Sequence, residues 1–392
     1  MSSLQYDFNK QIHRIGTSSI KYDRRKEVFN TEDVLPMWVA DMDFETPDFI
    51  RFAIIERAMH PIYGYTFRDD SYYEAMIGWL HRRHGWQVQK DWILYTPGVV
   101  PALNIAVLAH TDPGDKIIIQ PPVYFPFFTA VENHDRSLLI NQLLLEDGRY
   151  RMNYNELEQQ AKEARMLILC NPHNPVGRSW EKEELQQLAD ICLANDVLIL
   201  SDEIHNDLVL PPNQHQVLAA LSDEVAGITL TAHAASKTFN LAGLASSAMI
   251  IPNTSLRQQF EKQLKAMHIE MGNLFGFQAT QAAFTHGDEW VDQLLDYVQK
   301  NIEFTIKFLK EKLPKLRVIQ PEATYMVWLD FNAYGLTDDE LAETLIHQAG
   351  LGLNRGSMFG PGGSGFMRIN LACPMKIVQK ALDQLVRAFE AI

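Results

Sequence analysis

The chain has 392 residues, of which 46% are hydrophobic and 21% charged, with a formal net charge of −14. These proportions are typical of a globular protein, and the length predicts two domains or one large α/β domain with an appendage. The acidic balance argues against nucleic acid or an anionic membrane as the main partner.

Cysteine use and the N-terminus bear on location. Cys170, Cys192 and Cys373 form no CxxC pair, and an odd number suits no disulfide framework, so we expect a reducing cytoplasm. The N-terminal stretch has no apolar core of the kind a signal peptide needs. The longest apolar runs are too short to span a membrane, so no membrane partner is expected.

Short apolar runs alternate with helical patterns through the first two thirds of the chain. The patterns at 101–111 and 179–196 predict helices, the second with Ser179 as its N-cap. The apolar runs predict buried strands at 116–122, 164–172, 196–203, 227–237 and 246–252. This alternation indicates a mostly parallel sheet that is covered by helices on both faces.

After about residue 290 the pattern changes. Residues 288–314 predict one long amphipathic helix, and strand, helix, strand and helix follow at 324–332, 337–350, 365–373 and 375–392. We therefore expect a large domain over 45–288. A smaller α/β domain is expected from residues 1–44 together with 289–392.

Lys237 is unusual for its surroundings. It is the only Lys or Arg between Glu183 and Leu256, and small apolar residues flank it. Taken alone, it could extend to solvent along the apolar surface. A desolvated lysine, however, loses its proton more easily and becomes an amine nucleophile that can form a Schiff base.

Polar side chains also follow two of the predicted strands. Asn171 lies at the end of the run at 164–172 and Asn174 just after it, and Asp202 lies at the end of the run at 196–203. In open α/β sheets, ligands bind beyond the carboxyl ends of the strands, so these residues and Lys237 should converge. Each alone could be a cap or turn residue. Together they fit pyridoxal phosphate, which needs a Schiff-base lysine and an acid at its ring nitrogen.

A phosphate cradle is predicted at Gly98, Val99 and Val100, which lead into the helix beginning near Pro101. Backbone N–H groups at a helix N-terminus favour an anion. The alternative is an ordinary Pro/Gly turn before a helix.

Six motifs in chain order give a more specific indication: MWVADMDF, NPHNPVG, SDEIHNDLV, SKTFNLAGL, EATYMVW and FMRINLACP. Together they resemble the fold-type-I pyridoxal-phosphate enzymes of the aminotransferase class I/II superfamily, and within it the MalY/PatB branch of carbon–sulfur β-lyases or cystathionine β-lyases. The resemblance runs from about Met37 to Pro374. It implies a large domain with a mostly parallel seven-stranded sheet between helices, and a smaller α/β domain.

The resemblance implies a role for each matching residue around the cofactor ring. Lys237 would form the Schiff base, and Asp202 would pair with the pyridine nitrogen. Asn174 and His205 would lie near the phenolic oxygen, although many relatives carry Tyr where His205 stands. Tyr124 would stack on the ring.

The phosphate and the substrate have implied residues as well. Gly98, Val99 and Ser236 would hold the phosphate. Tyr63, counted with Lys237 as catalytic, would reach the phosphate of the partner subunit in a homodimer with shared active sites. Arg368 would bind the α-carboxylate of a small sulfur amino acid as a planar fork.

Ala40 and Asn174 would also line the substrate site. No metal site is expected, because His81 and His84 lie in a basic, surface-like HRRH stretch. The GPGGSG stretch at 360–365 fits a dinucleotide fingerprint by spacing alone. A β-like segment follows it instead of a helix, so it is interpreted as a mobile loop near the substrate.

The chain departs from the family pattern at two positions, and the first of them, a missing Arg, favours a lyase. Many aminotransferases carry an Arg where this chain has Ala245, and a Ser where it has Ala234. Phosphate binding would then depend on backbone groups, Ser236, Tyr63 and His233.

The resemblance therefore implies α,β-elimination from cystathionine or a cysteine S-conjugate, which yields a thiol, pyruvate and ammonia. An aminotransferase acting with a 2-keto acid is the alternative. A third hypothesis is a regulatory protein that keeps the cofactor site.

Overall fold

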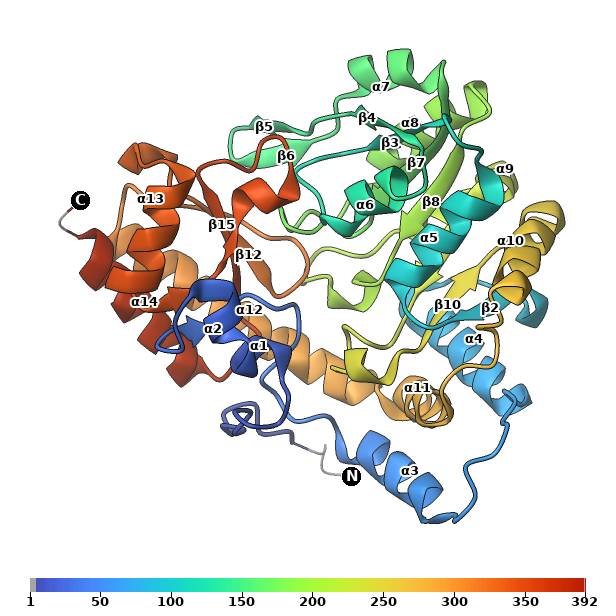
Figure 1. Cartoon of the computed structure of the whole chain (residues 1–392), viewed down its shortest axis with the longest axis horizontal. Helices are drawn as coiled ribbons and strands as arrows, with labels where there is room; N and C mark the ends of the chain where they lie inside the picture. The colour runs from blue at the N-terminus through green and yellow to red at the C-terminus, as the bar shows by residue number, and fades with distance from the viewer. Residues whose placement is uncertain (1–4, 391) are drawn as a thin grey trace.

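The computed structural model describes residues 5–390 and 392, and a seven-stranded sheet lies at its centre (Figure 1). The strand order is β2-β10-β9-β8-β7-β3-β4. Neighbours from β9 to β4 run parallel, whereas β10 is antiparallel to both β9 and β2. The sheet is therefore mixed but mostly parallel. Its strands are β2 (Ile93–Thr96), β3 (Lys116–Ile119), β4 (Ser137–Ile140), β7 (Ala164–Cys170), β8 (Leu198–Asp202), β9 (Thr229–His233) and β10 (Ser247–Ile250).

Helices cover both faces of this sheet, as the near-continuous apolar strands require. Alternate strand residues point to opposite faces: Met166 and Ile168 join one hydrophobic cluster, whereas Leu167 and Leu169 join another. The first face carries α5 (Val99–His110), α6 (Pro126–Glu132) and α10 (Thr254–Ala266). The second carries α7 (Tyr154–Ala161), α8 (Lys182–Ala194) and α9 (Asp223–Gly227).

The start of α8 differs from the prediction. Ser179 is not its N-cap: the cap is Glu181, which forms a capping box with Glu184. The Glu181 side chain accepts from the backbone N–H of Glu184, and the Glu184 side chain accepts from the backbone N–H of Glu181. The helix therefore begins at Lys182.

The C-terminal part contains a second sheet, in the order β11-β12-β15-β14. Its strands are β11 (Arg317–Ile319), β12 (Met326–Asp330), β14 (Asn354–Arg355) and β15 (Phe366–Asn370), and its helices are α13 (Asp338–Glu343), continued by a π-helical turn over Thr344–Gln348, and α14 (Met375–Phe389). The N-terminal segment joins this part, since β1 (Leu35–Pro36) pairs in parallel with β13 (Leu351–Gly352). On this basis we propose the division into 45–288 and 1–44 with 289–392.

The remaining elements lie around these two sheets. The predicted long helix is present as the 25-residue α12 (Asp288–Lys312). The others are α1 (Ile20–Asp23), α2 (Arg25–Phe29), α3 (Asp48–Met59), α4 (Asp70–His84), α11 (Leu274–His286) and the hairpin β5 (Leu144–Glu146)–β6 (Arg149–Arg151). None of the described helices is long and apolar enough to cross a membrane.

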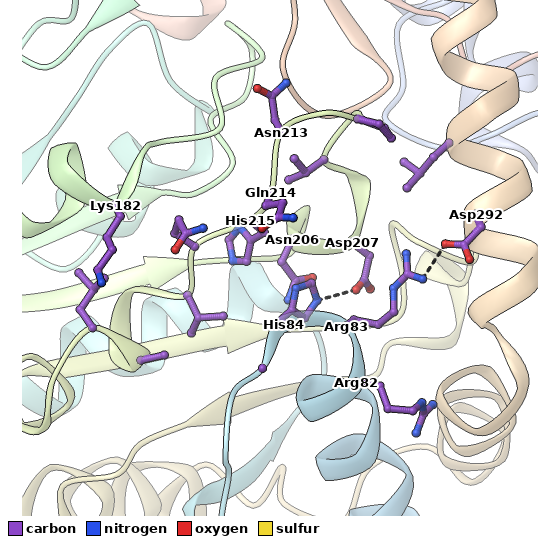
Figure 2. A pocket seen from close by; sticks show the side chains of 18 residues that line it. Arg82, Arg83, His84, Lys182, Asn206, Asp207, Asn213, Gln214, His215 and Asp292 are labelled. Atoms are coloured by element: carbon purple, nitrogen blue, oxygen red, sulfur yellow. Dashed lines mark hydrogen bonds and ion pairs between the residues drawn. The ribbon is translucent and has the colours of Figure 1, made fainter.

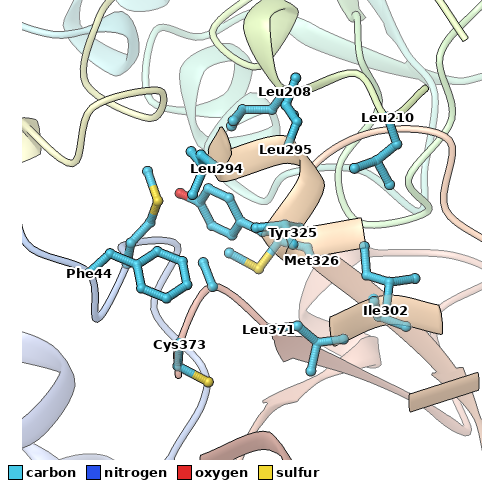
Figure 3. Packing of buried hydrophobic residues seen from close by; sticks show 14 of the residues in the cluster. Phe44, Leu208, Leu210, Leu294, Leu295, Ile302, Tyr325, Met326, Leu371 and Cys373 are labelled. Carbon is cyan, nitrogen blue, oxygen red and sulfur yellow. The ribbon is translucent and has the colours of Figure 1, made fainter. Parts of the chain in front are cut away.

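One hydrophobic cluster takes side chains from both parts of the chain (Figure 3). Leu208 and Leu210 come from the loop after β8, and Leu294 and Ile302 come from α12. Figure 3 also places Phe44, Tyr325, Met326, Leu371 and Cys373 in this cluster. The two parts therefore share a core and are not separated by a layer of solvent.

Candidate active site

The carboxyl ends of three adjacent parallel strands bring the predicted residues together. Cys170 at the end of β7 lies opposite Asp202 at the end of β8, and Asp202 lies opposite Ala232 of β9. The segments after these strands form a pocket of about 250 Å³. Its lining includes Ala40, Gly98, Val99, Val100, Tyr124, Asn174, Asp202, His205, Ser236 and Lys237.

Lys237 follows β9 and points at the N-terminal segment. Its Nζ donates to the carbonyl oxygen of Ala40 at 2.9 Å. Burial, with a smaller contribution from the charge of Arg368, lowers the pKa of Lys237 to about 8. A substantial fraction of this amine is therefore neutral, and nucleophilic, near pH 8.

Asp202 is the last residue of β8 and is only 3% exposed. Its Oδ1 accepts from the backbone N–H of Ile204 at 3.2 Å. Burial raises the pKa of Asp202 to about 7, although Lys237 and the Ile204 N–H act in the opposite direction. A cationic ring nitrogen against this carboxyl group would keep it ionised.

His205 and Asn174 supply further polar atoms to the pocket. His205 is buried, and its Nδ1 has no hydrogen-bond partner within the described residues. Burial, with the charges of Lys237 and Arg368, lowers its pKa to about 3, so the ring is neutral. The Oδ1 of Asn174 accepts from Arg368 Nη1 at 3.0 Å, which leaves the amide nitrogen to donate into the pocket.

The predicted phosphate cradle closes another side of the pocket. β2 ends at Thr96, Gly98 caps α5 with φ of +142°, and the helix begins at Val99. The first N–H groups of α5 have no partners inside the helix, so they favour an anion. The hydroxyl-bearing Ser236 and Ser246 line the same pocket.

Ser246 is one of several lining residues that the sequence did not single out. Its only signal was its position directly after Ala245, where an Arg is expected in many aminotransferases. The others are Pro97, Cys170, Ile204 and Ala242. Pro101 and Ala245, named above for the phosphate cradle and the missing Arg, line the pocket as well. His233, by contrast, was wrongly expected near the phosphate. Its Nδ1 accepts from the amide nitrogen of Asn206 at 3.1 Å, and its ring stacks on Phe284 with centroids 5.2 Å apart. It does not line this pocket.

Arg368 lies on β15, where it bridges the two parts of the chain. It is 3% exposed and binds Asn174 Oδ1, the Trp38 carbonyl at 2.9 Å and Asn354 Oδ1 at 2.6 Å. Its Nε has no partner within the described residues. Burial lowers the pKa of Arg368 to about 10, so it stays cationic at neutral pH. Arg368 does not itself line the pocket, but it contacts Asn174, which does.

Tyr63 is not part of this pocket in the single chain. Its side chain is exposed, its hydroxyl donates to the Ala58 carbonyl at 2.5 Å, and its ring contacts Phe275. The expected role, at the phosphate of a partner subunit, stays a prediction.

Two side chains that fix the N-terminal segment were also missed. Tyr325 donates to the Ala40 carbonyl at 3.1 Å, and Asn370 donates to the Val39 and Asp41 carbonyls at 2.7 and 2.6 Å. Both residues fell within quoted motifs, but no local pattern identifies a contact across about 300 residues.

His84 also differs from its surface-like interpretation. Its side chain is 4% exposed and its Nε2 lies 2.8 Å from Asp207 Oδ1. Within the part of the chain that the structure describes, no group of three or more His, Cys, Asp or Glu could hold a metal ion.

The donor set of the pocket fits pyridoxal phosphate. A helix N-terminus and two hydroxyls suit its phosphate, a buried carboxyl group suits its ring nitrogen, and an amine of lowered pKa suits its aldehyde. The Nδ1 of His205, which has no partner within the described residues, and the amide of Asn174 suit its phenolic oxygen. Each chemical group of the cofactor thus meets a complementary residue.

Comparisons with known proteins agree with this arrangement. The family model for aminotransferase class I and II matches residues 32–385. Cystathionine beta-lyase PatB of Bacillus subtilis is 44% identical over 384 residues, which cover 97% of this chain and 99% of PatB.

Two solved structures are also similar to this chain over nearly its whole length. Cystalysin from Treponema denticola, which contains a pyridoxal 5'-phosphate cofactor, is 36% identical with a TM-score of 0.96, over 99% of this chain and 100% of that chain. The PLP-bound C-S lyase from Staphylococcus hominis is 32% identical with a TM-score of 0.91, over 98% of both chains.

Proposed function

The chain belongs to the aminotransferase class I and II family, and from this premise we propose that it is a pyridoxal-phosphate-dependent carbon–sulfur β-lyase. It cleaves cystathionine or a cysteine S-conjugate to a thiol, pyruvate and ammonia. The observation that carries the proposal is the 44% identity to a cystathionine beta-lyase across 97% of the chain. The pocket at the strand ends supports it with a complete set of cofactor-binding groups.

One group of residues binds the cofactor. When bound, pyridoxal phosphate supplies an electron sink for the pair of electrons released at the substrate Cα. The α5 N-terminus, Ser236 and Ser246 would hold the phosphate, and Asp202 would keep a proton on the ring nitrogen. Tyr124 lines the pocket, where its ring would stack on the ring of the cofactor.

Lys237 and Arg368 act on the substrate. Arg368 binds the α-carboxylate and so fixes the direction of the Cα–H bond. Lys237 Nζ, as a neutral amine, removes the Cα proton, and its lowered pKa keeps it available for this step. The Cβ–S bond then breaks, and the sulfur leaves with the bonding electrons as a thiolate. The remaining three-carbon enamine hydrolyses to pyruvate and ammonia.

The enzyme is further proposed to be a homodimer that shares its active sites. The segment before α4 exposes an apolar surface that a second copy could cover. Its exposed members are Phe52, Ile55, Met59, Ile62, Tyr63, Tyr65 and Phe67. A cytoplasmic location is proposed because Cys170, Cys192 and Cys373 are all unpaired.

The test is to add L-cystathionine to the purified holoenzyme with no keto acid present. A lyase releases pyruvate and ammonia in equal amounts, and Lys237→Ala abolishes the release. An aminotransferase would instead stop after one turnover, with the cofactor as its amine form and no sustained pyruvate. That outcome would overturn the lyase proposal and leave the cofactor site intact.

A further inference from the structure

Asp207 is a buried carboxylate that the proposed lyase reaction does not use. It lies in the 3₁₀ turn over Asn206–Leu208, directly after His205. Figure 2 shows it beside His84, next to a cavity of about 620 Å³ that both residues line. A buried carboxylate needs hydrogen-bond donors, so its partners indicate which parts of the fold it connects.

Two donors to this carboxylate come from α4. Trp79 Nε1 donates to Asp207 Oδ1 at 3.0 Å, and His84 Nε2 lies 2.8 Å from the same oxygen (Figure 2). A carboxylate only accepts, so this nitrogen of His84 carries the hydrogen. Trp79 is itself buried, and its ring stacks on Phe284 of α11 with centroids 5.4 Å apart. Oδ1 is therefore bound to a helix that is fixed in the hydrophobic core.

The third donor is the residue next to Lys237. Thr238 Oγ1 donates to Asp207 Oδ2 at 2.8 Å, and Thr238 is fully buried. The following residue, Phe239, packs edge-on against the Trp79 ring, with centroids 5.6 Å apart. The backbone immediately after Lys237 is thus bound to the same carboxylate as α4.

The turn that contains Asp207 also carries a residue of the active site. The backbone N–H of Leu208 donates to the His205 carbonyl at 2.9 Å, which closes the turn. His205 lines the cofactor pocket. Burial and, next, the charge of Lys237 lower the pKa of His205, so the two side chains lie close together. Asp207 therefore joins the two chain segments from which His205 and Lys237 enter the pocket.

The Asp207 carboxylate is ionised at neutral pH. Burial alone would raise the pKa of Asp207, but the hydrogen bond and charge of His84 and, more weakly, the Thr238 hydroxyl lower it to about 2. Hydrogen bonds to an ionised acceptor are stronger than bonds between neutral groups. Loss of a donor would leave a buried charged oxygen with fewer partners, so the three donors favour one geometry.

From these contacts we propose that Asp207 is a positioning residue of the proposed lyase, which holds Lys237 through Thr238 and His205 through its own turn. The inference rests on the function proposed above. The amine that removes the Cα proton must keep its distance and direction, since a displacement of about 1 Å can lower the rate about a hundredfold. Asp207 does not line the cofactor pocket, so it acts through the backbone of these two segments.

Thr238→Val tests the bond that leads to Lys237, because valine has nearly the same shape and lacks the hydroxyl. We expect kcat with cystathionine to fall about tenfold to a hundredfold and KM to change less than about threefold. Thr238→Ser restores a hydroxyl and should recover most of the rate. Thr229→Val is the matched control: Thr229 is equally buried, lies at the opposite end of β9 from Lys237, and donates to the Val225 carbonyl at 2.7 Å.

A second measurement needs neither substrate nor bound cofactor. It follows the pH midpoint for modification of Lys237 by an amine-reactive reagent in the cofactor-free chain. Loss of the Thr238 bond should admit water to the amine and favour the ammonium form, so the midpoint should rise from about 8 by roughly half a unit or more. Thr229→Val should leave it in place. A loss of stability without displacement of Lys237 would not move the midpoint.

A double variant tests whether Asp207 acts through Thr238. Asp207→Asn keeps the shape of the side chain and replaces the charged acceptor by a neutral amide, which weakens the bond from Thr238. If the two residues act through this bond, Asp207→Asn combined with Thr238→Val loses little more kcat than Asp207→Asn alone.

Three results would overturn the proposal. Thr238→Val with normal kcat and a midpoint at about 8 would show that the bond does not position Lys237. Equal losses in Thr229→Val would reduce the effect to stability. Losses that add in full in the double variant would show that the two residues act independently. If the wild-type enzyme releases no pyruvate from cystathionine, the proposed function fails, whereas the midpoints of Thr238→Val and its control still decide whether this bond positions Lys237.

Discussion

The side-chain amine of Lys237 donates to the carbonyl oxygen of Ala40, 2.9 Å away, although 197 residues separate them along the chain. This contact belongs to an ordered series. Every backbone carbonyl from Met37 to Met42 accepts a hydrogen bond from a distant residue. The donors are Asn370, Arg368, Lys237, Tyr325, Arg14 and Asn240. The N-terminal segment is thus fixed from both parts of the molecule, and it presents one acceptor to Lys237.

The Asn370→Leu variant tests this positioning. It removes the donors to the Val39 and Asp41 carbonyls on either side of Ala40. We expect kcat to fall about tenfold to a hundredfold with KM nearly unchanged, because small displacements of a reacting group have effects of this size. Steady-state kinetics with cystathionine measures both constants.

Asn301→Leu is the matched control. Asn301 is also buried, and it donates to the Leu371 and Cys373 carbonyls without touching the N-terminal segment. Both variants should lose stability of about 2–4 kcal/mol for their unpaired carbonyls. If both lose kcat equally, the effect of Asn370 is only structural.

The reactivity of Lys237 should depend on pH in an unusual range. Because the pKa of this amine is lowered to about 8, the neutral form increases as pH rises through about 8 and not through the ordinary value near 10.4. In cofactor-free enzyme, modification of Lys237 by an amine-reactive reagent should follow this titration. Peptide mass spectrometry of samples quenched at each pH gives the rate.

Arg368→Gln should shift that titration upward. The Arg368 cation lowers the pKa of Lys237, so its removal stabilises the ammonium form. A midpoint that stays at about 8 in the variant would show that burial alone sets the pKa.

Asp202→Asn should separate stability from activity. The neutral amide cannot hold a proton on the ring nitrogen, so we expect kcat to fall at least about 10²-fold. In the cofactor-free chain, burial raises the pKa of Asp202 to about 7 from an ordinary value near 3.9. The folded state therefore binds more protons than the unfolded state between these values, so the free energy of unfolding falls as pH rises from about 4 to about 7 and stays a few kcal/mol lower above pH 7.

The expected result is that cofactor-free Asp202→Asn melts at a higher temperature than wild type at pH 8. The difference should shrink at pH 5, where Asp202 is protonated in the folded chain. A variant that melts lower than wild type at pH 8 would contradict this account. Scanning calorimetry at the two pH values provides the comparison.

Tyr63 can be tested by mixing subunits. If it serves the active site of a partner, Tyr63→Phe and Lys237→Ala homodimers are both impaired, but a mixed dimer contains one site with Lys237 from one chain and Tyr63 from the other. Co-refolding the two variants should then recover activity. If Tyr63 serves its own chain, the mixture stays as weak as its components.

The meeting of several site residues at one edge of the sheet was predictable from the sequence, because adjacent parallel strands have their carboxyl ends at the same edge. Asn174, Asp202 and Lys237 each follow a short apolar run, so a local pattern was enough to bring them together. A helix after Gly98 was predictable from the local Gly and Pro residues, but it begins at Val99 and not near Pro101.

Contacts that depend on tertiary packing were not predictable. His84 lies in a stretch of basic residues, yet Asp207 reaches it from a segment more than a hundred residues away. Ser179 is a good cap by residue type, but Glu181 and Glu184 satisfy the helix together. The hydrogen-bond donors to the backbone carbonyls of residues 37–42 could not be predicted, because the local sequence does not indicate which distant residue a carbonyl will bind.

The hydrophobic cluster that both parts share should prevent either part from unfolding on its own. Its side chains from α12, β12 and the loop after β8 pack on one another, so neither part can open without exposing the apolar surface of the other. Residues 45–288 expressed as a fragment would leave Leu208 and Leu210 facing water. The chain should accordingly melt in a single cooperative transition, with calorimetric and van't Hoff enthalpies that agree.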